Sequence, residues 1–101
     1  MTDESVAQAV NRLTAAGYTD DFRAEARGLL AVQSGCVHQP ESLIVDEVVR
    51  FEGITDPDDE AVVFALRCGE HGTKGTFTIV YGAQVPEADA AMARRLRLEH
   101  G

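Results

Sequence analysis

The sequence predicts an α+β fold, a two-layer sandwich in which two terminal helices cover one face of a four-stranded antiparallel meander. Helical periodicity occurs near each end of the chain, and four segments between the ends are rich in β-branched or alternating apolar residues. The links between these four segments are short, which favours antiparallel neighbours. We therefore expect the order helix, four strands, helix, in a single domain formed by residues 1–101.

The first helix is predicted over residues 3–16. Its apolar positions recur at helical spacing and form one stripe, made of Val6, Val10 and Leu13. Thr2 or Asp3 can cap the start of the helix. Gly17 suits its end, with Tyr18 placed to pack back on it.

The four strands are predicted over residues 22–33, 43–52, 60–68 and 73–81. The second strand places on one face Leu43, Val45, Glu47, Val49 and Phe51. On the third and fourth strands, the side chains expected to face the helices are those of Val62, Phe64, Leu66, Phe77, Ile79 and Tyr81. The connection of residues 69–72 is so short that the last two strands must form a hairpin.

The second helix is predicted to begin at Val85 and Pro86, because proline is favoured in the first helical position. Acidic residues come early in this segment and arginines come late, as the helix dipole favours. Its apolar contact with the sheet is expected from Met92 and Leu96.

The composition excludes several classes of function. A net charge of −8 argues against a nucleic-acid or anionic-membrane partner, because binding to phosphates needs a basic surface. No apolar run approaches the length of a membrane span. Two cysteines are too few for a secreted disulfide framework, and the acidic start of the chain lacks the apolar segment of a signal peptide. We therefore expect a cytoplasmic protein.

The first candidate site is the acidic loop between the second and third predicted strands. It contains Asp56, Asp58, Asp59 and Glu60 around Pro57. Clustered carboxylates bind hard cations such as magnesium, although the calcium-loop pattern is absent. Alternatively, the loop is a type I turn in which Pro57 sets the backbone angle and Asp56 accepts a hydrogen bond. Candidate ligand-binding residues are Arg50, Asp56, Asp58, Asp59 and Arg67.

A second candidate site combines cysteine and histidine. Cys36 and His38 follow the first predicted strand, and Cys68 and His71 follow the third. In a meander these two strand ends lie at the same edge of the sheet, so the four side chains could converge on zinc. In the alternative interpretation, Cys68 is a small core residue and both histidines are exposed turn residues.

No catalytic residue is assigned. Ser34, Cys36 and His38 lie close in sequence, but nothing in their order provides the oriented base that a nucleophile needs. Nucleophile-elbow, phosphate-loop and dinucleotide motifs are absent from the sequence.

The sheet face away from the helices is a third candidate. It should present Val63, Arg67, Thr76, Thr78 and Val80, with Arg23, Arg27 and Arg50 nearby. Antiparallel sheets commonly leave one face in solvent. A half-apolar face that carries arginine could instead hold an anionic ligand or a second copy of the chain, which would make the protein a homodimer.

The chain resembles a family of small bacterial proteins of unknown function. The most specific blocks are Arg50-Phe51-Glu52-Gly53 and Asp56-Pro57-Asp58-Asp59, and the resemblance covers about residues 17–82. Members often carry the label phosphoribosylpyrophosphate synthetase, so the resemblance implies the same label for this chain. Synthetases of that kind are much longer and use a phosphoribosyl-binding signature with glycines and a hydroxyl. The segment 56–61 lacks that signature, so this activity is not expected here.

Together these observations predict a small acidic binding or interaction module that self-associates, rather than an enzyme. The alternative is a small metal- or anion-dependent enzyme that uses the loop 56–60. Zinc and magnesium are the cofactors that the candidate residues could hold. A small-molecule ligand would be of unknown identity.

Overall fold

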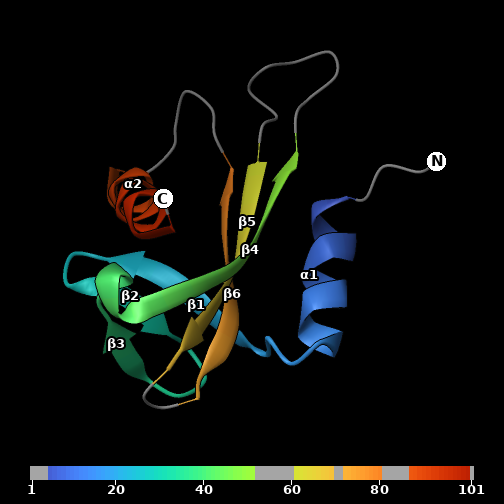
Figure 1. Cartoon of the computed structure of the whole chain (residues 1–101), viewed down its shortest axis with the longest axis horizontal. Helices are drawn as coiled ribbons and strands as arrows, with labels where there is room; N and C mark the ends of the chain where they lie inside the picture. Colours follow the sequence, from blue (N-terminus) through green and yellow to red (C-terminus); the bar gives the residue numbers. More distant parts are fainter. Residues whose placement is uncertain (1–4, 52–60, 70–71, 81–86, 101) are drawn as a thin grey trace.

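The computed structural model describes residues 5–51, 61–69, 72–80 and 87–100. Its elements, shown in Figure 1, are α1 (Val6–Ala15), β1 (Asp20–Glu25), β2 (Gly28–Ala31), β3 (Cys36–His38), the 3-10 helix η1 (Pro40–Ser42), β4 (Leu43–Phe51), β5 (Ala61–Cys68), β6 (Lys74–Val80) and α2 (Glu87–His100). The predicted α+β class is confirmed.

The described strands form one mixed sheet of six strands in the order β3-β2-β1-β6-β5-β4. It consists of two antiparallel meanders, β1-β2-β3 and β4-β5-β6. They are joined by a parallel contact of only two residue pairs, Asp20 with Gly75 and Asp21 with Thr76. The four-stranded antiparallel meander that the sequence predicts is therefore corrected to a six-stranded mixed sheet.

One of the two additional strands comes from the segment predicted as one strand over residues 22–33, and the other, β3, lies beyond it. This segment divides into the hairpin β1–β2, with Ala26 and Arg27 in the turn. Gly28 follows the turn with φ of 148°, and a Cβ atom there would lie 2.6 Å from the carbonyl oxygen of His38. Glycine is therefore required both by its own backbone conformation and by the close approach of β3. The strand β3 has three residues, too few to show alternation in the sequence.

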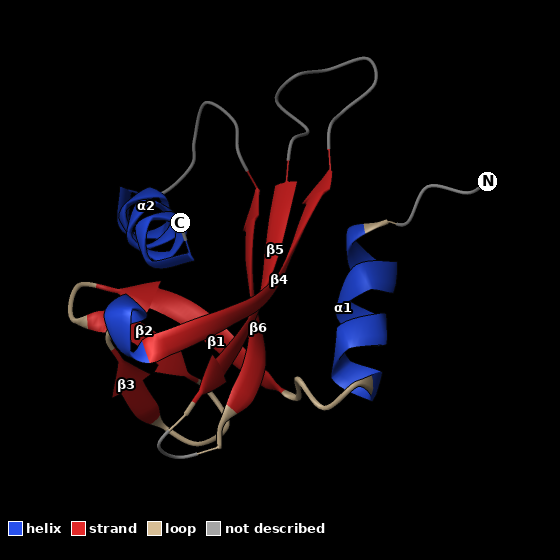
Figure 2. Ribbon diagram, in the orientation of Figure 1, coloured by secondary structure: helices blue, strands red, loops and turns tan. Residues whose placement is uncertain are grey.

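The two helices lie on opposite faces of the sheet, so the prediction that both cover one face is wrong (Figure 2). On β5, Phe64 and Leu66 pack in the core cluster that includes α2. Val63 and Ala65 pack in the cluster that includes Leu13 of α1. The apolar segment Ala61–Leu66 is buried at every position. A strand that is apolar on both faces needs a covering layer on each side, so the protein has three layers.

The strand β4 contains a bulge that changes which side chains face each helix. The register passes from Val45 opposite Leu66 to Glu47 opposite Ala65, which leaves Asp46 as the extra residue. Val45 consequently faces the α2 side, whereas Glu47 and the following odd-numbered residues face α1. The single face predicted from Leu43 to Phe51 is wrong, because one inserted residue reverses the alternation beyond it.

The predicted features of α1 are largely confirmed. The stripe of Val6, Val10 and Leu13 lies in the core cluster between α1 and the sheet. The predicted cap at Thr2 or Asp3 is wrong, because the helix begins at Val6 and its cap is Ser5, which forms a reciprocal capping box with Gln8. At the other end Gly17 has φ of 111°. Its N–H donates to Thr14 at 3.1 Å and that of Tyr18 donates to Leu13 at 3.0 Å, a Schellman motif.

The predicted apolar contact of α2 is also confirmed, since Met92 and Leu96 are buried against the sheet. The predicted start of this helix at Val85 and Pro86 lies outside the described residues. No helix within the described ranges is long and apolar enough to cross a membrane.

The parallel contact between the meanders gives a first prediction. A Cβ atom at Gly75 would lie 2.4 Å from the carbonyl oxygen of Asp20 and 2.9 Å from the Phe22 ring. We expect Gly75→Ala to lower the free energy of unfolding by about 1–3 kcal/mol or more, because backbone must move. The measurement is urea denaturation followed by circular dichroism.

The matched control is Gly69→Ala. A Cβ atom at Gly69 meets only the Ile44 side chain, at an ordinary contact distance of 3.7 Å. Its effect should stay within about 0.5 kcal/mol. Equal effects of the two substitutions would contradict the importance of the close contact at Gly75.

Candidate functional site

The two sequence-predicted ligand residues that the structure describes, Arg50 and Arg67, do not lie together. Arg50 lies opposite Val62, on the sheet face toward α2. Arg67 lies at the other end of β5 and on the opposite face, since it is an odd number of residues from Val62. The other three candidates, Asp56, Asp58 and Asp59, lie outside the described residues.

Arg67 belongs to a polar cluster that anchors the bulge of β4. Its Nε and Nη2 atoms donate to the two oxygens of Asp46 at 3.0 and 3.1 Å. The hydroxyl of Tyr18 donates to the same carboxylate at 2.6 Å, and Lys74 Nζ lies 4.5 Å from the Tyr18 ring centre. The hydrogen bonds from Arg67 lower the pKa of Asp46, and the hydrogen bond to Asp46 raises the pKa of Tyr18. These contacts join the end of α1 to the sheet.

The predicted zinc ligands have dissimilar environments. Cys36 is exposed, whereas Cys68 is buried as a core residue. His38 is also buried, with its ring edge-on to Phe22 at 5.9 Å, so the expectation that it is an exposed turn residue is wrong. The fourth ligand, His71, lies outside the described residues. Within the described ranges, no group of three or more His, Cys, Asp or Glu side chains could hold a metal ion.

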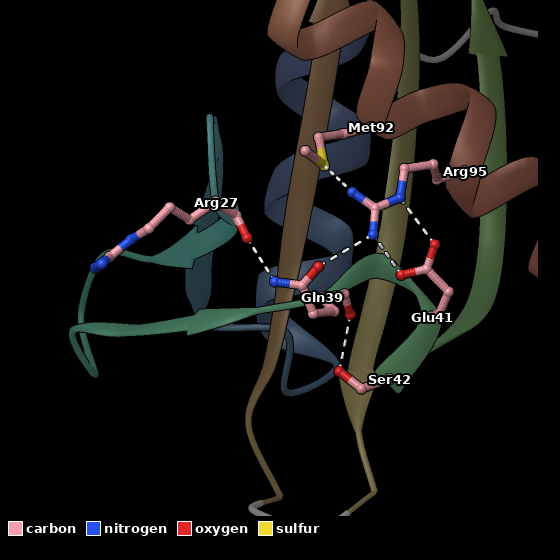
Figure 3. Close-up of polar contacts among 6 residues, drawn as sticks. All are labelled: Arg27, Gln39, Glu41, Ser42, Met92 and Arg95. Atoms are coloured by element: carbon pink, nitrogen blue, oxygen red, sulfur yellow. Dashed lines mark hydrogen bonds and ion pairs between the residues drawn. The ribbon is translucent and has the colours of Figure 1, made fainter.

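A second polar cluster fixes α2 to η1 and is shown in Figure 3. Arg95 donates to both carboxylate oxygens of Glu41, at 2.8 Å from Nε and 2.5 Å from Nη2. Arg95 Nη2 also donates to Gln39 at 3.1 Å, and the Gln39 amide donates to the carbonyl oxygen of Arg27. The hydrogen bonds from Arg95 lower the pKa of Glu41. This cluster therefore sets the position of α2 over the sheet.

The buried carboxylate of Asp20 fixes the start of β1, and its side chain is 7% exposed. It accepts hydrogen bonds from the backbone N–H groups of Asp21 and Gln33, both at 2.8 Å, and from the hydroxyl of Ser34 at 3.0 Å. Burial alone would raise the pKa of Asp20, but these hydrogen bonds outweigh it, so the pKa is lowered. The carboxylate thus holds the turn between β2 and β3.

A cleft opens where β1 and β6 separate beyond their two paired residues. Figure 1 shows β1 turning toward α2 while β6 continues alongside β5. The cleft has a volume of about 390 Å³ and is lined by residues 21–24 of β1, Phe77 and Thr78 of β6, and Asp89 of α2. Cavities of this size commonly hold small ligands. The ladder between β1 and β6 ends at Asp21 and Thr76, so the facing backbone edges beyond them are not paired with each other.

The charged groups of the cleft differ in their environments. Asp21 and Arg23 form an ion pair at the exposed rim, with Oδ2 and Nε 3.3 Å apart. Asp89 is half-buried, and burial raises the pKa of its carboxyl. Within the described part of the chain, no hydrogen bond or ion pair reaches the Asp89 carboxylate. Of the polar groups that line the cleft, it is the one best placed to bind a ligand.

Sequence reasoning missed this cleft because its walls come from three separate segments. In the sequence, Asp89 is one of the acidic residues early in the second predicted helix, and Phe22 and Phe77 are apolar residues of predicted strands. The one signal available in the sequence was a carboxylate among small and apolar residues, at Ala88-Asp89-Ala90.

Comparison of the chain with protein-family models, curated proteins and solved structures finds no match. Function therefore has to follow from the chemistry of the described residues.

The Asp20 contacts give a second prediction. We expect Asp20→Asn to lower the free energy of unfolding at pH 7 by about 1–3 kcal/mol, because hydrogen bonds to a buried carboxylate are lost or weakened. A carboxyl with a lowered folded-state pKa contributes stability above its unfolded pKa, near 3.9. That contribution is lost as the pH falls through the folded value. The difference between the two proteins should therefore shrink at acidic pH.

The measurement is urea denaturation of both proteins between pH 7 and pH 3. Glu25→Gln is the control, because Glu25 is exposed on the same strand. A destabilisation by Asp20→Asn that stays constant over this pH range would contradict the electrostatic account.

Proposed function

We propose that the protein is a non-enzymatic binding module whose ligand is a small molecule held in the cleft between β1, β6 and α2. The observation that carries this proposal is the cleft itself, in which the separating edges of β1 and β6 and the half-buried carboxylate of Asp89 surround a volume of about 390 Å³. Binding sites use a few placed polar groups, including backbone N–H and C=O groups, to orient the ligand.

The other perturbed carboxylates support binding rather than catalysis. Asp20, Glu41 and Asp46 all have lowered pKa values, and in each the hydrogen-bond partners connect elements of the fold. General acid–base catalysis near neutral pH favours a group whose pKa is close to 7. These three carboxylates are shifted in the opposite direction and serve the architecture.

The proposal keeps the expected family and compartment and changes the expected site. We also propose that the chain belongs to the small bacterial family that carries the Arg50–Gly53 block, and that it lacks phosphoribosylpyrophosphate synthetase activity. We further propose that the protein is cytoplasmic. The free thiols of Cys36 and Cys68 agree with a reducing compartment.

The cleft proposal is tested by filling the cleft. We expect a thermal-shift screen of small metabolites to yield ligands whose NMR titrations move the amides of residues 21–24, 77, 78 and 89. Ala24→Leu should weaken such ligands about tenfold or more, because Ala24 lines the cleft on the α2 side of the sheet and the larger side chain occupies their space. Ala7→Leu, at an exposed position of α1, is the matched control. Ligands whose shifts map away from the cleft, or that are unaffected by Ala24→Leu, would refute the proposal.

A second candidate function is self-association through the outer face of β1-β2-β3. Val37 of the edge strand β3 lies next to Leu30 on this face and is 36% exposed, and the adjoining turn exposes Val32 at 45%. Arg23 and Glu25 lie on the same face, so a two-fold contact could pair each with its opposite charge in a second copy. An edge strand with exposed apolar side chains is a natural surface for pairing.

Self-association is tested by light scattering during size-exclusion chromatography. We expect a dimer at high micromolar concentration, converted to monomer by Val37→Lys, which places a charge on the proposed contact. Ile44→Lys is the matched control, since Ile44 is 43% exposed on the opposite edge strand β4. A wild-type monomer at that concentration, or equal effects of both substitutions, would rule out this interface.

A further inference from the structure

We infer that the cleft between β1, β6 and α2 selects a small organic cation, whose ammonium group is bound by Asp89. This inference rests on the proposed function and names the chemical class of the ligand. It concerns a site formed only by described residues.

The first support is the position of Asp89. Its carboxylate is half-buried on the wall of a cavity of about 390 Å³ and receives no hydrogen bond or ion pair from the described residues. Burying an ionised carboxylate without a partner is unfavourable. A ligand ammonium group would supply the missing partner in a charge-assisted hydrogen bond. Burial also raises the pKa of the Asp89 carboxyl.

The second support is the charge of the surrounding groups. The other charged residues that line the cleft are Asp21 and Arg23, and they already form an ion pair with each other. β6 contributes Thr78, which does not titrate. An anionic ligand would therefore meet a carboxylate without a compensating free cation on the cleft wall. The net charge of −8 also attracts cations toward the protein.

The third support distinguishes an organic cation from a metal ion. The described residues hold no group of three metal-ligating side chains. Hard metal ions need several oxygen ligands. An ammonium group can be held by one carboxylate together with neighbouring hydrogen-bond acceptors, and Asp89 supplies the carboxylate. The facing edges of β1 and β6 can add backbone carbonyl acceptors.

The experiment compares three probes of nearly equal shape: benzylamine, benzyl alcohol and benzoate. Affinities are measured at pH 7 by NMR titration of the amides of residues 21–24, 77, 78 and 89. We expect benzylamine to bind about tenfold or more tightly than benzyl alcohol, and benzoate to bind least, because only the ammonium group pairs with Asp89.

Two variants connect this preference to one carboxylate. Asp89→Asn should abolish the preference for benzylamine over benzyl alcohol. Glu87→Gln is the matched control, since Glu87 is an exposed acid in the same turn of α2 and does not line the cleft. It should retain the preference. In the wild type, saturating benzylamine should lower the pKa of Asp89 measured from its carboxyl carbon resonance, whereas benzyl alcohol should not.

The outcomes separate this inference from the proposal on which it rests. Equal binding of the amine and the alcohol, tighter binding of benzoate, or a preference that survives Asp89→Asn would overturn cation selection while leaving a ligand cleft. If no probe moves the cleft amides, cation selection is overturned as well. The metabolite screen and the Ala24→Leu variant then decide whether the cleft binds a ligand.

Discussion

The architecture depends on a parallel contact of two residue pairs between β1 and β6. This contact joins two antiparallel meanders that would otherwise be separate sheets, and it requires a residue without a side chain at Gly75. The short length of this contact, two residue pairs, also matters. Because the strands separate beyond Asp21 and Thr76, the same contact that unites the sheet also opens the cleft beside it. Stability and the candidate site therefore have one structural origin.

Around this contact, most of the perturbed carboxylates are committed to holding the fold. Asp20 fixes the turn after β2, Asp46 connects the β4 bulge to α1, and Glu41 attaches α2 to η1. Each has a lowered pKa because its charged form is hydrogen-bonded. Asp89 is the exception, since burial raises its pKa and the described residues offer it no partner. The first three carboxylates therefore stabilise the fold, whereas the Asp89 carboxylate is available to a ligand.

Local patterns predicted the interior of individual elements well. The alternation on β5 identified Phe64 and Leu66 as core residues, and the spacing on α1 identified its stripe. Predictions failed where one residue changed the pattern. The bulge at Asp46 reversed the alternation of β4, and the turn before Gly28 divided one expected strand into two. A single inserted or turning residue leaves composition almost unchanged, so periodicity averaged over a segment does not detect it.

The sequence by itself determined the class, the central strands, the end of α1 at Gly17 and the continuous apolar segment of β5. These depend on spacing and backbone preference within one segment. Only the tertiary structure decided that the helices lie on opposite faces, that β1 pairs with β6, and that Asp89 lies beside Phe22 and Phe77. Those features depend on contacts between separate segments of the chain, such as that of Asp20 with Gly75. Such contacts are selected by the packing of the whole chain, because no local pattern specifies which face of the sheet a given apolar helix face will cover.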